Sequence, residues 1–263
     1  EKPILDGYVF KADTKYAEGL KKAGFNILSL ANNHSLGGGN ELLSKTIKAL
    51  DENNIIYVGA GENIRKAREI KYLNVNNIKV AFIASTFVCE DTYSAGDKNP
   101  GIYKGNEELV LQDVKKAKLN SNIIVVSLHW GREKDFMPEK TQIKLAHDLV
   151  DTGADLIIVH HPHVLQGLEI YKKKIILYSL GNFIFDNTME ISKTNISMIF
   201  KCYFSKESFE IKKVEVTPIV LKYDKLFPIT AAGKEKKEVI VFIKELLIAT
   251  ILWGLEIVLA KFI

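Results

Sequence analysis

The sequence predicts an α/β protein in which helices cover the faces of a sheet. Helical and strand patterns alternate along the first 161 residues. The strand segments are short aliphatic runs, which is typical of strands buried on both faces. No internal repeat, low-complexity stretch or Pro/Gly-rich linker divides the 263 residues. A single domain is therefore the simplest organisation.

Each element follows from its periodicity. Apolar residues at helical spacing predict helices, the first of which ends at the stop signal Gly24, over residues 12–24, 40–54, 106–120 and 139–153. Aliphatic runs between them predict strands over residues 25–31, 55–61, 76–85, 121–130 and 154–161. These segments account for the alternation.

After Ile170 the pattern becomes antiparallel. Residues 168–186 predict a hairpin that closes on Lys172–Lys174, and residues 195–224 predict further antiparallel strands. This lysine cluster and the one at Lys234–Lys237 are interpreted as solvated turns.

Composition excludes some classes of function. The formal charge of +4 comes from 36 basic and 32 acidic residues spread along the chain, too weak an excess to indicate nucleic-acid binding. Cys89 and Cys202 are far apart and lack the spacing of a metal or redox motif, so they are interpreted as isolated thiols.

The two ends differ from an ordinary globular chain. Glu1 is preceded by no methionine, basic segment or apolar segment, so we expect that a signal peptide or anchor was removed or not included and that the chain is a fragment. The apolar residues 248–263 are interrupted by Glu256 and Lys261, which is borderline for a membrane span. They predict either a terminal helix packed on the domain or a partner, or a membrane-associated tail.

Polar side chains follow four of the predicted strands. The carboxyl ends of strands are where open α/β sheets place their ligands. The residues at these ends are Asn32, Asn33 and His34, then His129, then His160, His161 and His163, and finally Asn182. This repetition favours a functional site over a set of structural histidines.

A metal site fits this chemistry. In the segment His161–Pro162–His163, alternate residues of an extended backbone point the same way, and Pro162 biases His161 towards that conformation. His129 can add a third nitrogen and Asn33 an amide oxygen. Such ligands suit manganese, iron or zinc without choosing among them. The alternative is that the histidines satisfy backbone groups and no metal binds.

Three blocks of sequence carry a family resemblance. They are "SLANNHSLGGG" at residues 29–39, the stretch from "SLHWGREKDF" to "LQGLEIY" at 127–171, and "LYSLGNFIFD" at 177–186. Together they closely resemble the bacterial CapA-like capsule-synthesis proteins, which are associated with poly-γ-glutamate capsules. That family is similar to the calcineurin-like metallophosphoesterases, so the resemblance implies a four-layered α/β/β/α sandwich over residues 1–247, followed by the apolar tail.

The resemblance also implies roles for individual residues. Asn33 matches a metal-bridging asparagine and His34 a catalytic histidine, while the metal ligands fall on His129, His161 and His163. In the family a glycine precedes the last pair of histidines, whereas in this chain Val159 and His160 precede His161 and His163.

The start of the chain departs from the family pattern. The opening "EKPI" matches the tail of an Asn-Leu-Glu motif, which would make Glu1 a further ligand. The N-terminal strand that carries a Gly-Asp motif is then missing. Gly37 stands where the family often has Asp.

The implied mechanism is metal-assisted hydrolysis or transfer. One or two divalent ions (Mn, Fe or Zn) activate a water for in-line attack on a phosphoryl or similar centre, and His34 protonates the leaving oxygen. Arg132 is expected to stabilise an anionic substrate and Glu133 to orient water or a histidine. His160 and Asn182 are expected to line the substrate pocket. His147 lies in a helical pattern and receives no role.

Two functions follow from the resemblance. The first is a metal-dependent hydrolase or transferase of capsule or cell-envelope polymer biosynthesis, acting on an anionic polymer or a phosphorylated small molecule. The alternative is a non-catalytic, membrane-associated component of a polyglutamate synthesis or export complex. Both imply membrane-bound capsule synthesis proteins as partners and an extracytoplasmic, membrane-associated location at the cell envelope for the full-length protein, without nucleic acid.

Overall fold

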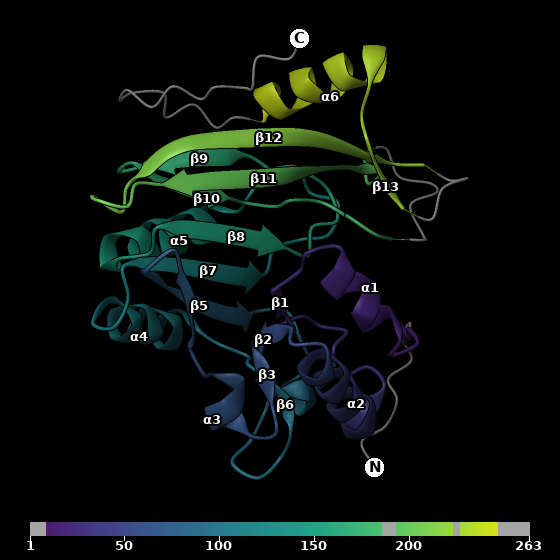
Figure 1. Cartoon of the computed structure of the whole chain (residues 1–263), viewed down its shortest axis with the longest axis vertical. Coiled ribbons are helices and arrows are strands. Elements are labelled where there is room, and N and C mark those ends of the chain that lie inside the picture. The colour runs from purple at the N-terminus through teal and green to yellow at the C-terminus, as the bar shows by residue number, and fades with distance from the viewer. Residues whose placement is uncertain (1–8, 186–192, 223–226, 247–263) are drawn as a thin grey trace. The chain divides into compact units, whose positions relative to one another are not determined.

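The structure is a computed structural model that describes residues 9–185, 193–222 and 227–246 (Figure 1). The chain divides into two compact units, residues 1–129 and residues 130–263.

The first unit combines helices with parallel and antiparallel strands. Its helices are α1 (Tyr16–Lys22), α2 (Gly39–Glu52), α3 (Ile64–Ala67) and α4 (Glu107–Lys118), with a 3-10 turn at Asp91–Tyr93. Its strands are β1 (Ile27–Ser29), β2 (Ile56–Val58), β3 (Ala60–Gly61), β4 (Lys71–Val75), β5 (Ile78–Thr86), β6 (Gly101–Ile102) and β7 (Ile123–His129). The three helices and four strands predicted for this part of the chain are confirmed.

Strand pairing in this unit explains how β7 is held. β7 runs parallel to β5, in register from Val80 opposite Ile123 to Thr86 opposite His129. β4 pairs antiparallel with the other edge of β5, and β1 pairs parallel with β2. Helix α4 contacts both β5 and β7. The carboxyl ends of β5 and β7 therefore lie next to each other.

The hairpin between β4 and β5 was not predicted. Its turn consists of Asn76 and Asn77, which have φ angles of +52° and +66°. Two consecutive left-handed residues form the tight turn that matches strand twist, and asparagine tolerates this conformation better than most residues. The strand predicted over residues 76–85 therefore begins only at Ile78, because its first two residues form the turn.

Gly59 divides the strand predicted over residues 55–61 into β2 and β3. Its φ angle is +85°, a conformation that side chains with a Cβ rarely adopt. A Cβ at this position would also lie 2.5 Å from the Cβ of Ala31 and 3.1 Å from that of Ala84. Both alanines belong to a buried cluster with Val58. The chain can thus turn and pack at this point because residue 59 has no side chain.

We expect Gly59→Ala to lower the free energy of unfolding by about 3 kcal/mol, because backbone strain and steric overlap add. The matched control is Gly24→Ala, where φ is +93° but no atom lies within 4 Å of the added Cβ. Backbone strain alone should lower the free energy of unfolding of this control by about 1 kcal/mol. Urea denaturation measures both variants, and equal losses would show that packing around Gly59 is not tight.

The second unit contains two sheets. Helix α5 (Lys140–Thr152) precedes a sheet with the strand order β8-β10-β9, built from β8 (Leu156–His160), β9 (Leu168–Tyr171) and β10 (Lys174–Leu177). β8 and β10 are parallel, and β9 is antiparallel to β10. The second sheet is antiparallel and contains β11 (Ile196–Phe204), β12 (Ile211–Leu221) and β13 (Pro228–Thr230).

The predicted hairpin on the lysine run is confirmed, in a shorter form. Lys172 and Lys173 have φ angles of +48° and +65° and form a two-residue turn between β9 and β10. The hairpin strand ends at Leu177 because the chain then turns towards Asn182.

The second lysine cluster was misinterpreted as a turn. Residues 234–237 lie in the first turns of helix α6 (Gly233–Glu245). The buried residues Val239, Phe242 and Ile243 recur at helical spacing on the opposite face, and α6 lies along β12 (Figure 1). The lysines belong to the polar side of an amphipathic helix.

Within the described parts of the chain, every helix is too short or too polar to cross a membrane. The apolar tail at residues 248–263 lies outside the described residues, as does Glu1.

Candidate functional site

The first unit brings Asn33 and His129 together. After β1 the chain turns, and the amide oxygen of Asn32 accepts the backbone N–H of His34 at 2.9 Å, a turn that asparagine favours. His129 is the last residue of β7, and its carbonyl oxygen accepts the N–H of Phe87 at 2.9 Å. The Oδ1 atom of Asn33 lies 2.9 Å from Nε2 of His129. The predicted convergence of these two strand ends is present.

This spacing suits two ligands of one ion as well as a hydrogen bond. Two donor atoms that each bind a metal at about 2.1 Å, at roughly right angles, lie about 3 Å apart. Asn33 Oδ1 and His129 Nε2 meet that condition. The donor set, one amide oxygen and one imidazole nitrogen, matches manganese, iron or zinc.

His34 lies beside this pair in the sequence but faces outwards. Its side chain is exposed, and its ring meets the ring of Phe10 edge-on, with 4.8 Å between centroids. An exposed imidazole next to a candidate metal ligand can reach a bound substrate. This placement is compatible with proton transfer.

The second unit orients His163 through Asn182. The Nδ2 atom of Asn182 donates to the carbonyl oxygen of Thr194 at 3.1 Å, which fixes the orientation of the amide. Oδ1 of Asn182 then accepts the Nδ1–H of His163 at 2.8 Å. In the neutral ring the lone pair consequently lies on Nε2. Metal-binding histidines are typically held in this way by a hydrogen bond to the second ring nitrogen.

The prediction of an extended His-Pro-His segment is wrong. β8 ends at His160, and the φ angles of His161 and His163 are +106° and +62°. The carbonyl oxygen of Pro162 accepts the N–H of Lys134 at 2.7 Å, so the segment is held as a turn. The two rings still approach each other, with 6.2 Å between centroids and 50° between planes. Strained backbone of this kind often marks functional sites.

Two buried glutamines near this turn were not predicted. Nε2 of Gln166 donates to the carbonyl oxygen of Asp135 at 2.9 Å, and the backbone N–H of Glu139 donates to Oε1 of Gln142 at 2.8 Å. They attach the loop after Gly131 to the segments on either side. Gln142 completes a capping box with Glu139 at the start of α5, a local contact that the three-residue spacing could have indicated. The contact of Gln166 joins residues distant in sequence, so only the tertiary structure reveals it.

His160 is held as a neutral imidazole. Burial lowers its pKa to about 4, because the surrounding protein disfavours the charged ring. Its carbonyl oxygen accepts the N–H of Trp130 at 3.1 Å. At neutral pH His160 offers one donor and one acceptor and no positive charge.

Arg132 and Glu133 lie on the surface. The Arg132 side chain is 74% exposed, and its Nε pairs with Oε1 of Glu139 at 2.8 Å. Glu133 is exposed. Arg132 therefore pairs with the N-terminal cap of α5 rather than with its neighbour.

His147 belongs to a buried network. Its Nε2 lies 2.7 Å from Oε1 of Glu169, and the Tyr178 hydroxyl donates to Oε2 of the same carboxylate at 2.7 Å. The His147 ring stacks on Tyr171 at 3.8 Å. These contacts give the buried Glu169 its polar partners.

The candidate metal donors thus lie in two pairs, Asn33 with His129 in one unit and His161 with His163 in the other. Among residues 9–185, 193–222 and 227–246, no group of three or more His, Cys, Asp or Glu side chains is arranged to hold a metal ion. Asn33, which would bind metal through its amide oxygen, is not one of these four residue types. The predicted ligand Glu1 lies outside the described residues.

The two cysteines should be poorly reactive. Burial raises the pKa of Cys89 to about 11 and that of Cys202 to about 12. The reactive thiolate is therefore scarce at pH 8, and we expect both to react with a disulfide reagent at least about 100-fold more slowly than free cysteine. The rate should rise about tenfold per pH unit. Absorbance kinetics measure this, with the urea-unfolded chain as control, and rates equal to that control would contradict it.

Two solved structures share the fold of this chain. A candidate 5′-nucleotidase from Staphylococcus aureus, solved in complex with α-ketoglutarate, superposes with a TM-score of 0.54 at 18% identity, over 88% of this chain and 44% of that chain. A hypothetical protein from Thermus thermophilus gives a TM-score of 0.52 at 13% identity, over 79% and 81%. At these identities the likeness shows the fold alone, and the predicted fold class is confirmed.

Residues 1–187 match the family described as "Bacterial capsule synthesis protein PGA_cap", and the chain belongs to this family. It is 38% identical over 229 residues to the capsule biosynthesis protein CapA of Bacillus anthracis, covering 84% of this chain and 54% of that protein. It is 34% identical over 214 residues to the PGA biosynthesis protein CapA of Bacillus subtilis (strain 168), covering 79% and 56%. The chain spans about half the length of these relatives. The CapA-like resemblance is confirmed.

Proposed function

We propose that this chain carries the metal site of a hydrolase or transferase that acts in the biosynthesis of a poly-γ-glutamate capsule or a related cell-envelope polymer. The observation that carries the proposal is the pairing of Asn33 Oδ1 with His129 Nε2 at 2.9 Å. The orientation of His163 by Asn182 supports it. The metallophosphoesterase-like fold agrees with this chemistry.

The donors fit one or two divalent ions of manganese, iron or zinc. Asn33 and His129 form one donor pair, His161 and His163 form another, and Glu1 is a further candidate ligand. When bound, such an ion polarises the reacting group and lowers the pKa of a bound water. In the neutral ring, the amide of Asn182 places the lone pair of His163 on Nε2, so that this nitrogen is the one that can bind metal.

The remaining residues have proposed roles towards the substrate. His34 protonates the leaving oxygen, since its exposed ring can meet a substrate from solution. Neutral His160 and Asn182 line the substrate pocket. Arg132 stabilises an anionic substrate after release from Glu139, and Glu133 orients water or a histidine.

The names of the relatives support the polymer context. The B. anthracis relative is named for capsule biosynthesis, the B. subtilis one for PGA biosynthesis, and a Mycobacterium tuberculosis one as a probable polyglutamine synthesis accessory protein. A capsule is part of the cell envelope. The proposed substrates are an anionic polymer or a phosphorylated small molecule, and the proposed partners are membrane-bound capsule synthesis proteins. The full-length protein would then act outside the cytoplasm, attached to the membrane.

The test is elemental analysis of protein purified without a histidine tag, loaded with manganese, iron or zinc and then desalted. We expect about one or two equivalents of metal and turnover of a phosphoester or γ-glutamyl substrate that EDTA abolishes. His34→Asn should lower kcat about 100-fold or more and leave the metal content unchanged. Absence of metal would reject the proposal and favour the non-catalytic component of a synthesis or export complex.

A further inference from the structure

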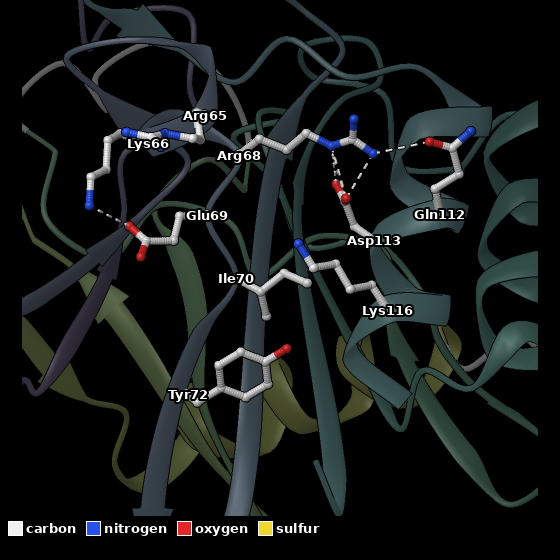
Figure 2. Close-up of a pocket in the computed structure, with 9 residues that line it drawn as sticks. All are labelled: Arg65, Lys66, Arg68, Glu69, Ile70, Tyr72, Gln112, Asp113 and Lys116. Carbon is white, nitrogen blue, oxygen red and sulfur yellow. Dashed lines mark hydrogen bonds and ion pairs between the residues drawn. The ribbon is translucent and has the colours of Figure 1, made fainter. Parts of the chain in front are cut away.

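The first unit contains a pocket of about 640 Å³ that sequence analysis did not predict (Figure 2). Its volume is within the range of roughly 300–1,000 Å³ that is typical of small-molecule sites. Its lining comes from α3 and the segment that follows it, from β4, and from α4. The lining residues are Arg65, Lys66, Arg68, Glu69, Ile70, Tyr72, Gln112, Asp113 and Lys116. Four cationic side chains face two carboxylates, which leaves the pocket positive.

Arg68 is held rigidly in the wall of this pocket. Its Nε donates to both carboxylate oxygens of the buried Asp113, at 2.9 and 3.0 Å, and its Nη2 donates to the carbonyl oxygen of Leu109 at 3.1 Å. The Tyr103 hydroxyl donates to the same carboxylate at 2.8 Å. Within the described residues these hydrogen bonds engage Nε and Nη2 of Arg68. The guanidinium also interacts with Tyr103. A cation fixed in this way loses little entropy when a ligand binds to it.

Two further cations of the pocket have no ion-pair partner among the described residues. They are Arg65 at α3 and Lys116 near the end of α4. Figure 2 shows the Lys116 side chain reaching from α4 towards the segment that carries Ile70. By contrast, the pocket carboxylate Glu69 is neutralised by Lys71 at 2.8 Å and Lys66 at 3.5 Å. Unpaired positive charge therefore lies on opposite walls of the pocket.

We propose that this pocket binds a short oligomer that carries a carboxylate on each unit, such as a γ-linked glutamate chain. The choice of polymer rests on the proposed function. Arginine and lysine side chains on separate elements match carboxylates that are spaced along a chain, and arginine binds carboxylate with two parallel hydrogen bonds. The Tyr72 hydroxyl supplies another donor.

The lining favours carboxylates over a phosphate group. Phosphate sites commonly use the backbone N–H groups at the N-terminus of a helix. Here α4 contributes Gln112, Asp113 and Lys116, which lie in its middle and last turn, and the cationic contacts are side chains. The experiment must therefore distinguish binding of phosphate from binding of carboxylates.

The experiment is calorimetric titration of the whole chain with tetra-γ-glutamate, with inorganic phosphate and pyrophosphate in separate runs. We expect tetra-γ-glutamate to bind more tightly than either phosphate compound. Arg65→Gln and Lys116→Gln should each weaken binding about tenfold, as expected for the loss of a hydrogen bond to a charged group. The matched control is Lys115→Gln, an exposed lysine of α4 outside the pocket lining. Arg68 is left unchanged, because its loss would disturb the attachment of α4.

Absence of tetra-γ-glutamate binding would overturn the proposal, and so would tighter binding of phosphate. An equal loss in Lys115→Gln would also overturn it, because it would indicate only a general attraction between charges. Metal content and EDTA-sensitive turnover are measured on the same preparations. Intact metal and turnover without tetra-γ-glutamate binding would reject this pocket alone, whereas missing metal would reject the proposed function.

Discussion

Replacing His161 and His163 together with alanine is expected to lower metal retention at least about 100-fold and to abolish metal-dependent turnover. The two imidazoles lie with 6.2 Å between centroids, and Nε2 of His163 is kept available by Asn182. Loss of one outer-shell partner typically costs 10- to 100-fold in metal affinity, so loss of the two proposed ligands should cost more. Elemental analysis after desalting and a phosphoester assay measure the two effects.

Substitutions of Asn182 test whether this residue supports metal binding by orienting His163. Asn182→Leu removes the acceptor of the His163 Nδ1–H and should weaken metal binding about 10- to 100-fold. Asn182→Asp keeps an acceptor there and should restore much of the affinity. His147→Gln is the matched control, since it removes a histidine from a different network. Metal retained in the double variant, or lost equally in the control, would contradict assignment of the site to the His-Pro-His turn.

Arg68→Met is expected to lower the free energy of unfolding by about 3 kcal/mol. The Asp113 side chain is 6% exposed, and the variant removes its cationic partner. A buried carboxylate without a counter-charge typically costs 3–5 kcal/mol, and the 28% exposure of Arg68 places the expected loss at the lower end. Urea denaturation measures the change.

A double-mutant cycle tests whether this loss comes from the charge. Asp113→Asn keeps an oxygen that can accept the Tyr103 hydroxyl but removes the negative charge. The double variant Arg68→Met/Asp113→Asn should therefore be more stable than Arg68→Met alone. A double variant whose loss equals the sum of the two single losses would show that the ion pair itself contributes little.

Local patterns were enough to predict most of the elements. Helices over residues 12–24, 40–54, 106–120 and 139–153 are confirmed with ends shifted by a few residues. The elements that were missed or misinterpreted have other causes. β4 was missed because the turn that joins it to β5 consists of two asparagines and contains no glycine. Helix α6 was missed because its lysines dominate the sequence around the buried residues Val239, Phe242 and Ile243.

The sequence by itself determined which residue types stand at the strand ends, because a strand that is buried along its length places its first polar residues where it emerges from the sheet. The sequence therefore predicted that Asn33 and His129 converge. Its motifs also indicated the family to which the chain belongs. The structure confirms their approach at 2.9 Å.

Only the tertiary structure decided how these groups are oriented. The positive φ angles of His161 and His163, the Asn182 amide fixed by Thr194, and the pocket around Arg68 all depend on residues distant in sequence. Hydrogen-bond direction and electrostatic pairing require atoms to be placed within fractions of an ångström, and sequence spacing does not contain that information. Spacing predicts which side chains are available, whereas packing determines which atom of each one faces a ligand.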